Sequence, residues 1–189
     1  MQRFLRTAIL TVCTSLLLVV PLATQAGAAV VYVSDPPGDG SNGTGGAGPR
    51  KFGDIGRIRV AHGDGRMWLT VIPARGGQLA DYYEFWVDVN AANAGPEFLV
   101  DVTLEVSPLV TVQQTDRFGQ RGRTLCRPST GGFDRGSQVL RLNVPRSCLK
   151  TPGFPEPVRL RVSAHARMDY ESADWAPGIR LFGPWARNG

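Results

Sequence analysis

Hydrophobic and polar residues alternate along much of the chain, and this period of two is typical of half-buried β-strands. In residues 98–106, one face carries Phe98, Val100, Val102, Leu104 and Val106, and the other carries Leu99, Asp101, Thr103 and Glu105. The same alternation recurs in residues 57–61, 139–144 and 158–164. No segment shows the helical period of about 3.6 residues. We therefore expect a fold of strands in which any helix is short.

Turn-forming residues separate these segments. The Gly63-Asp64-Gly65 run predicts a hairpin, and the glycine-rich and proline-rich residues 35–53 exclude a regular element there. We expect about eight or nine strands, at residues 30–34, 55–61, 67–73, 82–90, 97–106, 109–114, 122–126, 138–144 and 157–166. Many antiparallel strands joined by tight turns are typical of a β-sandwich or an open barrel. We predict an all-β fold, an antiparallel β-sandwich over which the C-terminal tail packs irregularly.

The N-terminus departs from this alternation. Residues 1–6 carry only positive charges, an uncharged and largely apolar run follows to residue 23, and small residues follow that run. This order is typical of a secretory signal peptide, which we place at residues 1–28. The remaining residues 29–189 then form a single domain with no membrane span, and the protein is secreted, extracellular or held in the cell envelope.

Two other readings of the N-terminus stay open. The apolar run is near the lower length limit for an uncleaved membrane anchor, but Pro21 and the small residues that follow it favour cleavage. A lipoprotein is the second alternative. It would need a small residue before its cysteine, whereas Val12 precedes Cys13.

Once the signal peptide is removed, two cysteines remain, Cys126 and Cys148. Two cysteines in an exported domain most often form a disulfide, and we predict that bond here. A metal pair or a reactive thiol is the alternative, but neither histidine lies close to either cysteine in the sequence. The two cysteines also lie too late and too close together for the immunoglobulin pattern.

Charge and motifs narrow the function. The net charge of +5 is spread along the chain, whereas a nucleic-acid surface needs clustered basic residues. There is no G-x-S-x-G motif, and His62 and His165 lack the ligand spacing of a zinc site. Glu84 and Asp88 share a strand face, but nothing indicates a cleft around them. We expect a protein that is not an enzyme and does not bind nucleic acid.

The strongest candidate for a binding site is the polar face of residues 82–90. Trp86 lies there between Glu84 and Asp88, and an aromatic ring flanked by carboxylates is typical of a sugar-binding platform. Trp68 would join this platform if its strand were a neighbour. The alternative is that the tail covers this face, with Trp175 or Trp185 packing on Trp86. A further alternative is that Arg57 and Arg59 pair with the acidic residues of this face across strands.

A second group of candidates could bind a metal. Asp35, Asp39 and Asp54 surround the glycine-rich loop, and Asn90 follows the strand that carries Trp86. Calcium is bound by six to eight oxygens, often from loop carboxylates and carbonyls. Asp and Asn are also common in turns because they hydrogen-bond their own backbone. These residues alone establish no cofactor, and a structural calcium ion is the candidate that they suggest.

The segments DPPGD at 35–39, DI at 54–55 and YYEFWVDVN at 82–90 resemble small exported β-sandwich proteins of high-GC Gram-positive bacteria. Those proteins in turn resemble the DOMON and family 9 carbohydrate-binding-module superfamily. The resemblance implies a sandwich that binds a sugar, a haem or calcium. Haem-binding members use a methionine and a histidine, and this chain offers Met67, Met168, His62 and His165.

These observations lead to one functional expectation and one alternative. We expect an exported, non-catalytic binding module, with an extracellular carbohydrate or an envelope glycan as its ligand. The alternative is a protein-interaction or structural component of the cell envelope that binds no small molecule and has an envelope protein as its partner.

Overall fold

The structure is a computed structural model that describes residues 28–39 and 53–188, apart from 94, 106, 129–130, 135, 153–154 and 169–170. Residues 1–27 of the expected signal peptide lie outside the described residues. The elements are β1(Ala29–Ser34), β2(Ile55–Gly63), β3(Arg66–Pro73), β4(Tyr82–Asp88), β5(Phe98–Thr103), β6(Leu109–Gln114), β7(Thr124–Cys126), β8(Gly131–Asp134), β9(Val139–Pro145), a short 3₁₀ helix η1(Arg146–Leu149), β10(Arg159–Met168), β11(Glu171–Ala176) and β12(Ala186–Arg187).

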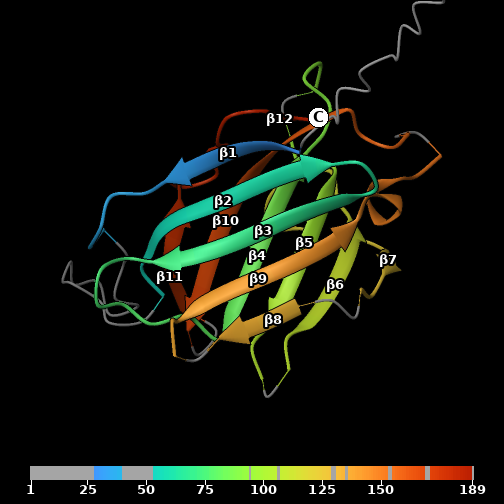
Figure 1. Ribbon diagram of the computed structural model, residues 1–189. Helices are drawn as coiled ribbons and strands as arrows, with labels where there is room; N and C mark the ends of the chain where they lie inside the picture. The colour runs from blue at the N-terminus through green and yellow to red at the C-terminus, as the bar shows by residue number, and fades with distance from the viewer. Residues whose placement is uncertain are drawn as a thin grey trace, which may run out of the picture.

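The strands form two antiparallel sheets, one in front of the other in Figure 1, so the predicted all-β sandwich is confirmed. The five-stranded sheet has the order β1-β2-β3-β9-β8. The seven-stranded sheet has the order β11-β10-β4-β5-β6-β7, with β12 paired to β10. The chain passes between the sheets after β3, after β7 and after β9. Strands that are neighbours in sequence, such as β3 and β4, therefore lie in different sheets.

The core lies between the sheets and is built from the apolar face of each strand. In β4, the inward residues Tyr83, Phe85 and Val87 are almost completely buried. Phe98, Val100 and Val102 pair with them across β5, as the alternation predicts. The fold thus follows from period-two burial of apolar side chains, at roughly 25 cal/mol for each Å² removed from water.

All nine expected strand positions carry strands, and the structure adds β8, β11 and β12. The sequence analysis expected no strand at Gly131-Gly132, which begins β8 and pairs with β9. It also expected an irregular tail, whereas residues 171–176 form the edge strand β11. Both errors have the same cause. Short edge strands owe their structure to backbone pairing with a neighbour, and their own side chains carry little hydrophobic pattern.

The expected disulfide between Cys126 and Cys148 is present. Cys126 ends β7 at the edge of the seven-stranded sheet, and Cys148 lies in η1, directly after β9 of the five-stranded sheet. The bond therefore joins the two sheets along one side of the sandwich. No helix among the described residues has the length and apolar character needed to cross a membrane.

Candidate functional site

The outer face of the seven-stranded sheet carries three of the four expected ligand residues, Glu84, Trp86 and Asp88, all on β4. The fourth, Trp68, lies on β3 in the other sheet. The expectation that Trp68 and Trp86 share one platform was therefore wrong. It depended on β3 and β4 being neighbours, and the crossover between them places the two rings in different sheets.

Trp86 lies on the expected face but is only 1% exposed. Phe118, from the loop between β6 and β7, covers it with a ring-centroid distance of 5.5 Å. Phe118 in turn contacts Trp175 and Phe182 of the C-terminal segment. The alternative predicted that the tail covers this face, with Trp175 or Trp185 packing on Trp86. The tail does cover the face, but the side chain in contact with Trp86 is the loop residue Phe118. Trp86 thus has no open ring surface for a sugar.

Asp88 is equally enclosed. It is fully buried, and Arg161 on the neighbouring strand β10 holds one of its carboxylate oxygens through Nε at 2.7 Å and through a terminal nitrogen at 2.6 Å. Phe182 and Trp185 lie over the guanidinium group of Arg161, at 4.8 and 4.7 Å from its central carbon. On this half of the sheet face, aromatic rings thus cover the ion pair between Asp88 and Arg161.

The other half of the face carries a charged network centred on Glu84. One carboxylate oxygen lies 2.9 Å from Arg121, and the other lies 2.9 Å from Nδ1 of His165. The His165 ring stacks on Trp175 with centroids 4.2 Å apart. Arg121 also pairs with Asp101, the residue directly across from Glu84 on β5. Arg121, from an irregular loop, therefore bridges two carboxylates on adjacent strands.

The surroundings of this network shift the pKa values of both acidic residues, Glu84 and Asp101. Burial raises the pKa of Glu84, but hydrogen bonds from His165 and Arg121 outweigh it and hold the pKa below its ordinary value. Burial raises the pKa of Asp101, and the Arg121 charge opposes this only in part. Glu84 is thus held as an ionised hydrogen-bond acceptor.

A pocket of about 270 Å³ opens beside this network. Its lining residues come from three strands and one loop: Tyr82, Asp101, Thr103, Arg121 and Arg167. The sequence analysis missed this pocket because two of its walls, Arg121 and Arg167, lie far from β4 in the sequence. A signal was present in Tyr82, which alternation places on the same face as Glu84.

His62, His165 and Met67 are buried, and Met168 is partly buried. His62 is fully buried on β2, opposite Met67 on β3, and burial lowers its pKa. His165 is nine-tenths buried against Glu84 and Trp175. Met168 lies at the end of β10. His62 and Met67 thus lie together inside the core, whereas His165 and Met168 lie along the single strand β10.

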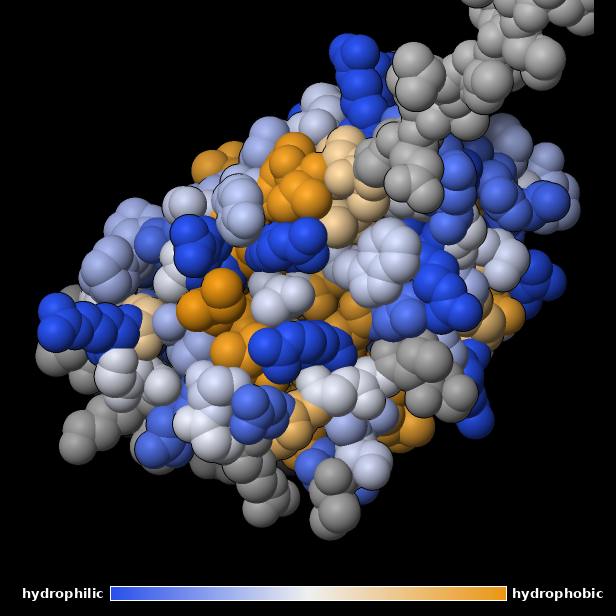
Figure 2. Space-filling model, in the orientation of Figure 1, coloured by the Kyte–Doolittle hydropathy of each residue, from blue (hydrophilic) through white to orange (hydrophobic). Residues whose placement is uncertain are grey.

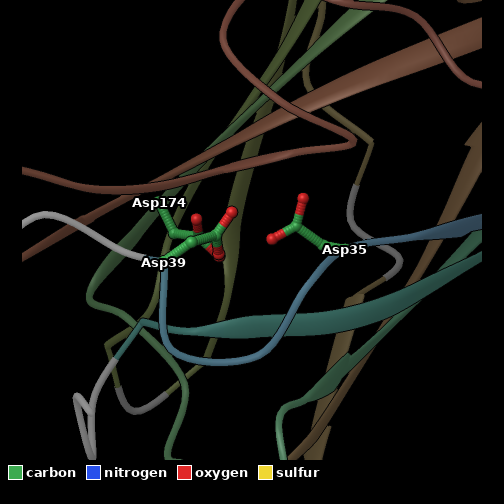
Figure 3. Close-up of side chains that lie close together, drawn as sticks. All are labelled: Asp35, Asp39 and Asp174. Atoms are coloured by element: carbon green, nitrogen blue, oxygen red, sulfur yellow. The ribbon is translucent and has the colours of Figure 1, made fainter. Parts of the chain in front are cut away.

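A cluster of four aspartates lies at the sandwich edge formed by β1 and β11. Carboxylate oxygens of Asp35, Asp39 and Asp174 all lie within 4.8 Å of one another. Figure 3 shows the Asp35 side chain directed toward the other two. Asp54, directly before β2, accepts a hydrogen bond of 2.9 Å from the backbone amide of Gly38 in the same loop. The sequence predicted Asp35, Asp39 and Asp54 but missed Asp174, which arrives from the other sheet.

Asn90 does not join this cluster. It follows β4 beyond Asp88, whereas the pairing of β10 places Asp174 at the Tyr83 end of that strand. Its side chain accepts a hydrogen bond of 3.0 Å from the amide of Ala92. Asn90 therefore fits the alternative of a turn residue that bonds its own backbone.

Burial and mutual repulsion raise the pKa values in the cluster. Removal from water, followed by the charges of Asp174 and Asp39, raises the pKa of Asp35 to about 8. Burial likewise raises the pKa of Asp174 to about 6, against hydrogen bonds from the amides of Ile55 and Trp175. Burial also raises the pKa of Asp54. Burial and repulsion thus favour the protonated form of these carboxyl groups, and no basic side chain of the described residues forms an ion pair with them.

The outer face of the five-stranded sheet is basic. Across it, Tyr32, Arg59, Thr70 and Arg141 form one cross-strand row. The Arg57 guanidinium lies 5.1 Å from the centre of the Tyr32 ring. Figure 2 shows hydrophilic side chains lying across hydrophobic ones on this face. The sequence suggested that Arg57 and Arg59 pair with the acidic residues of β4 and β5. They do not, because these arginines and acidic residues lie on different sheets.

Comparison with models of known protein families, with curated proteins and with solved structures finds no match for this chain.

Proposed function

We propose that the protein is an exported, non-catalytic binding module for an extracellular carbohydrate or envelope glycan. The observation that carries the proposal is the pocket beside Arg121, on the open half of the seven-stranded sheet. The proposed site differs from the expected one. The sequence analysis chose Trp86 and Asp88, which are covered, whereas the pocket is lined by Tyr82 on the same strand and Asp101 on the next strand.

The chemistry of the pocket suits a ligand rich in hydroxyl groups. Tyr82 supplies a half-buried aromatic ring that can pack against the C–H face of a sugar. Asp101 accepts hydrogen bonds from hydroxyls, and Arg121 and Arg167 donate them. The ion pairs of Arg121 with Glu84 and Asp101 hold these groups in place before a ligand arrives, which lowers the entropy cost of binding.

The same ion pairs argue against hydrolysis. A glycosidase needs two carboxyl groups with the scissile bond between them, one of them able to donate a proton. Here Arg121 contacts both Glu84 and Asp101, so a guanidinium group lies between the two carboxylates. Glu84 is also held in its ionised form by His165. We therefore propose that the pocket binds and does not cleave.

Calorimetric titration of the purified protein with soluble plant and bacterial-envelope glycans tests this proposal. We expect one glycan to bind, and we expect Tyr82→Ala and Asp101→Asn each to weaken it about tenfold or more, since each removes a contact in the site worth at least about 1.4 kcal/mol. Tyr32→Ala is the matched control, because Tyr32 is half-exposed on the other sheet. Absence of binding across the panel, or equal binding by Tyr82→Ala, would contradict the proposal.

The basic face around Arg59 supports a second candidate, an envelope protein as partner. Tyr32 and Val30 are exposed there, and Tyr32 lies beside Arg57, an arrangement that suits an acidic surface. Crosslinking of intact envelopes tests this candidate. A crosslinked partner that is lost with Arg59→Ser and retained with Tyr82→Ala would place the interaction on the five-stranded sheet, whereas the reverse pattern would favour the pocket.

A further inference from the structure

We propose that Asp35, Asp39, Asp54 and Asp174 bind one calcium ion, which fastens the loop after β1 to strand β11. This inference is independent of the glycan pocket, which lies on the outer face of the seven-stranded sheet. It rests on four carboxylates from two sheets and on buried oxygens to which the described part of the chain supplies no donor.

The backbone already brings the four groups to one place. The Asp35 amide donates a hydrogen bond of 3.3 Å to the carbonyl of Gly56, which ties the loop to β2. The Gly38 amide donates to Asp54, which closes the loop on itself. The Ile55 amide donates to Asp174 at 2.7 Å, which brings β11 against the start of β2. These bonds position the carboxylates without using their remaining lone pairs.

The unpartnered oxygens are the observation that points to a ligand. Asp35 is 6% exposed, and among the described residues no N–H or hydroxyl group donates a hydrogen bond to either of its carboxylate oxygens. Oδ1 of Asp54, which is 5% exposed, also lacks one. Buried carboxylates are normally paired or bound to a metal, because an uncompensated buried charge is costly. Among the described residues, no basic side chain forms an ion pair with any of the four.

The ligand set suits calcium. Oxygen-only sites select hard cations, and calcium accepts six to eight oxygens at 2.3–2.6 Å in flexible geometry. Two oxygens on one such ion lie at most about 5 Å apart, and those of Asp35, Asp39 and Asp174 lie within 4.8 Å of one another. Asp39 is exposed, so an ion can enter from solvent and keep water ligands on that side. Magnesium needs a stricter octahedron and loses its water reluctantly.

The location gives the ion a structural role. β1 is the edge strand of one sheet, and β11 is the edge strand of the other. The disulfide joins the sheets at the opposite side, through Cys126 in the far edge strand β7. The ion and the disulfide would thus fasten the sandwich along its two sides.

Titration with calcium chloride after treatment with EDTA tests the proposal in the purified protein. At pH 7.5 we expect one ion per chain and a melting temperature that rises with calcium concentration, because the ion binds only the folded state. Asp35→Asn should weaken calcium binding by at least about tenfold, since even the loss of a group that only hydrogen-bonds a metal ligand has an effect of that size. Asp116→Asn is the matched control, because Asp116 is an exposed aspartate in another loop and should bind calcium normally.

Three outcomes would overturn the proposal. The first is no calcium binding by the wild type at millimolar concentration. The second is unchanged binding by Asp35→Asn. The third concerns Arg50 and Lys51, which lie in the sequence between Asp39 and Asp54 and outside the described residues. If a variant with Gln at both positions lost stability while calcium had no effect on the wild type, a basic side chain of the chain itself would be the neutralising group.

Discussion

The carboxylate of Asp174 in β11 accepts a hydrogen bond of 2.7 Å from the backbone amide of Ile55 at the start of β2. The two residues are 119 positions apart in the sequence and belong to different sheets. The side chain of Ile55 is fully buried in the core, so its amide has no access to water. One bond therefore satisfies a buried donor, joins the sheets and places Asp174 among the other aspartates.

This bond predicts different results for two substitutions of Asp174. Asp174→Ala leaves the Ile55 amide without an acceptor and should lower the free energy of unfolding by about 2 kcal/mol. Asp174→Asn keeps an acceptor oxygen for the Ile55 amide but loses the oxygen that accepts from the amide of Trp175, so in EDTA its effect should be smaller than that of Asp174→Ala. Urea unfolding in EDTA, followed by tryptophan fluorescence, measures both. Equal losses would show that an acceptor for the Ile55 amide does not by itself stabilise the fold.

The raised pKa of Asp35 predicts that the calcium-free protein loses stability as the pH rises. With a pKa of about 8 in the folded state against 3.8 unfolded, Asp35 holds a proton in the folded protein that the unfolded chain has released. Stability falls with rising pH wherever the folded state binds more protons than the unfolded state. For Asp35 this range runs from about pH 4 to pH 8. Above pH 8 the contribution of Asp35 is constant.

The window between pH 6.5 and 8 isolates this effect. The pKa values of Asp174 and Glu97 are both raised to about 6, so these two groups titrate mainly below this window. The groups facing Asp35 are Asp39, Asp54 and Asp174, with the phenol of Tyr83, whose pKa burial raises, near Asp174. Melting temperatures in EDTA should fall across this window in the wild type and stay level in Asp35→Asn. Saturating calcium should also remove the slope, because the ion replaces the proton.

Alternation along the chain predicts which residues of a strand face the core, and β4 shows this clearly. Tyr83, Phe85 and Val87 are buried on the predicted inner face, and Glu84 and Trp86 lie on the other face. Alternation is local, because successive side chains of a strand point to opposite sides. It carries no information on which strands share a sheet. That limit explains the error over Trp68 and Trp86.

The candidate sites show the same limit. Asp35, Asp39 and Asp54 are predictable because they flank one loop, but Asp174 reaches them through the pairing of β11 with β10. Arg121 reaches Glu84 from a loop 37 residues away. Phe118 is a lone aromatic residue in a polar loop, which is a usable signal for a covering side chain, although the surface it covers is set by the tertiary structure.

The disulfide predicts a stability difference that depends on oxidation. Its loop of 22 residues should contribute roughly 3 kcal/mol, by restricting the unfolded chain. The double variant Cys126→Ser and Cys148→Ser should therefore unfold at lower urea concentration than the oxidised wild type. The reduced wild type should match the variant. If reduction has no effect on the wild type, the two sheets are held together without the bond.

Trp86→Ala separates a structural role from a binding role for this residue. Because Trp86 is 1% exposed and packed beneath Phe118, removing the indole leaves a cavity and should lower the free energy of unfolding by about 3–5 kcal/mol. Trp86→Phe keeps most of the ring and should lose much less. Urea unfolding of both variants, followed by circular dichroism, measures the difference. A stable Trp86→Ala variant that has lost glycan binding would instead return Trp86 to the binding surface and show that Phe118 moves aside.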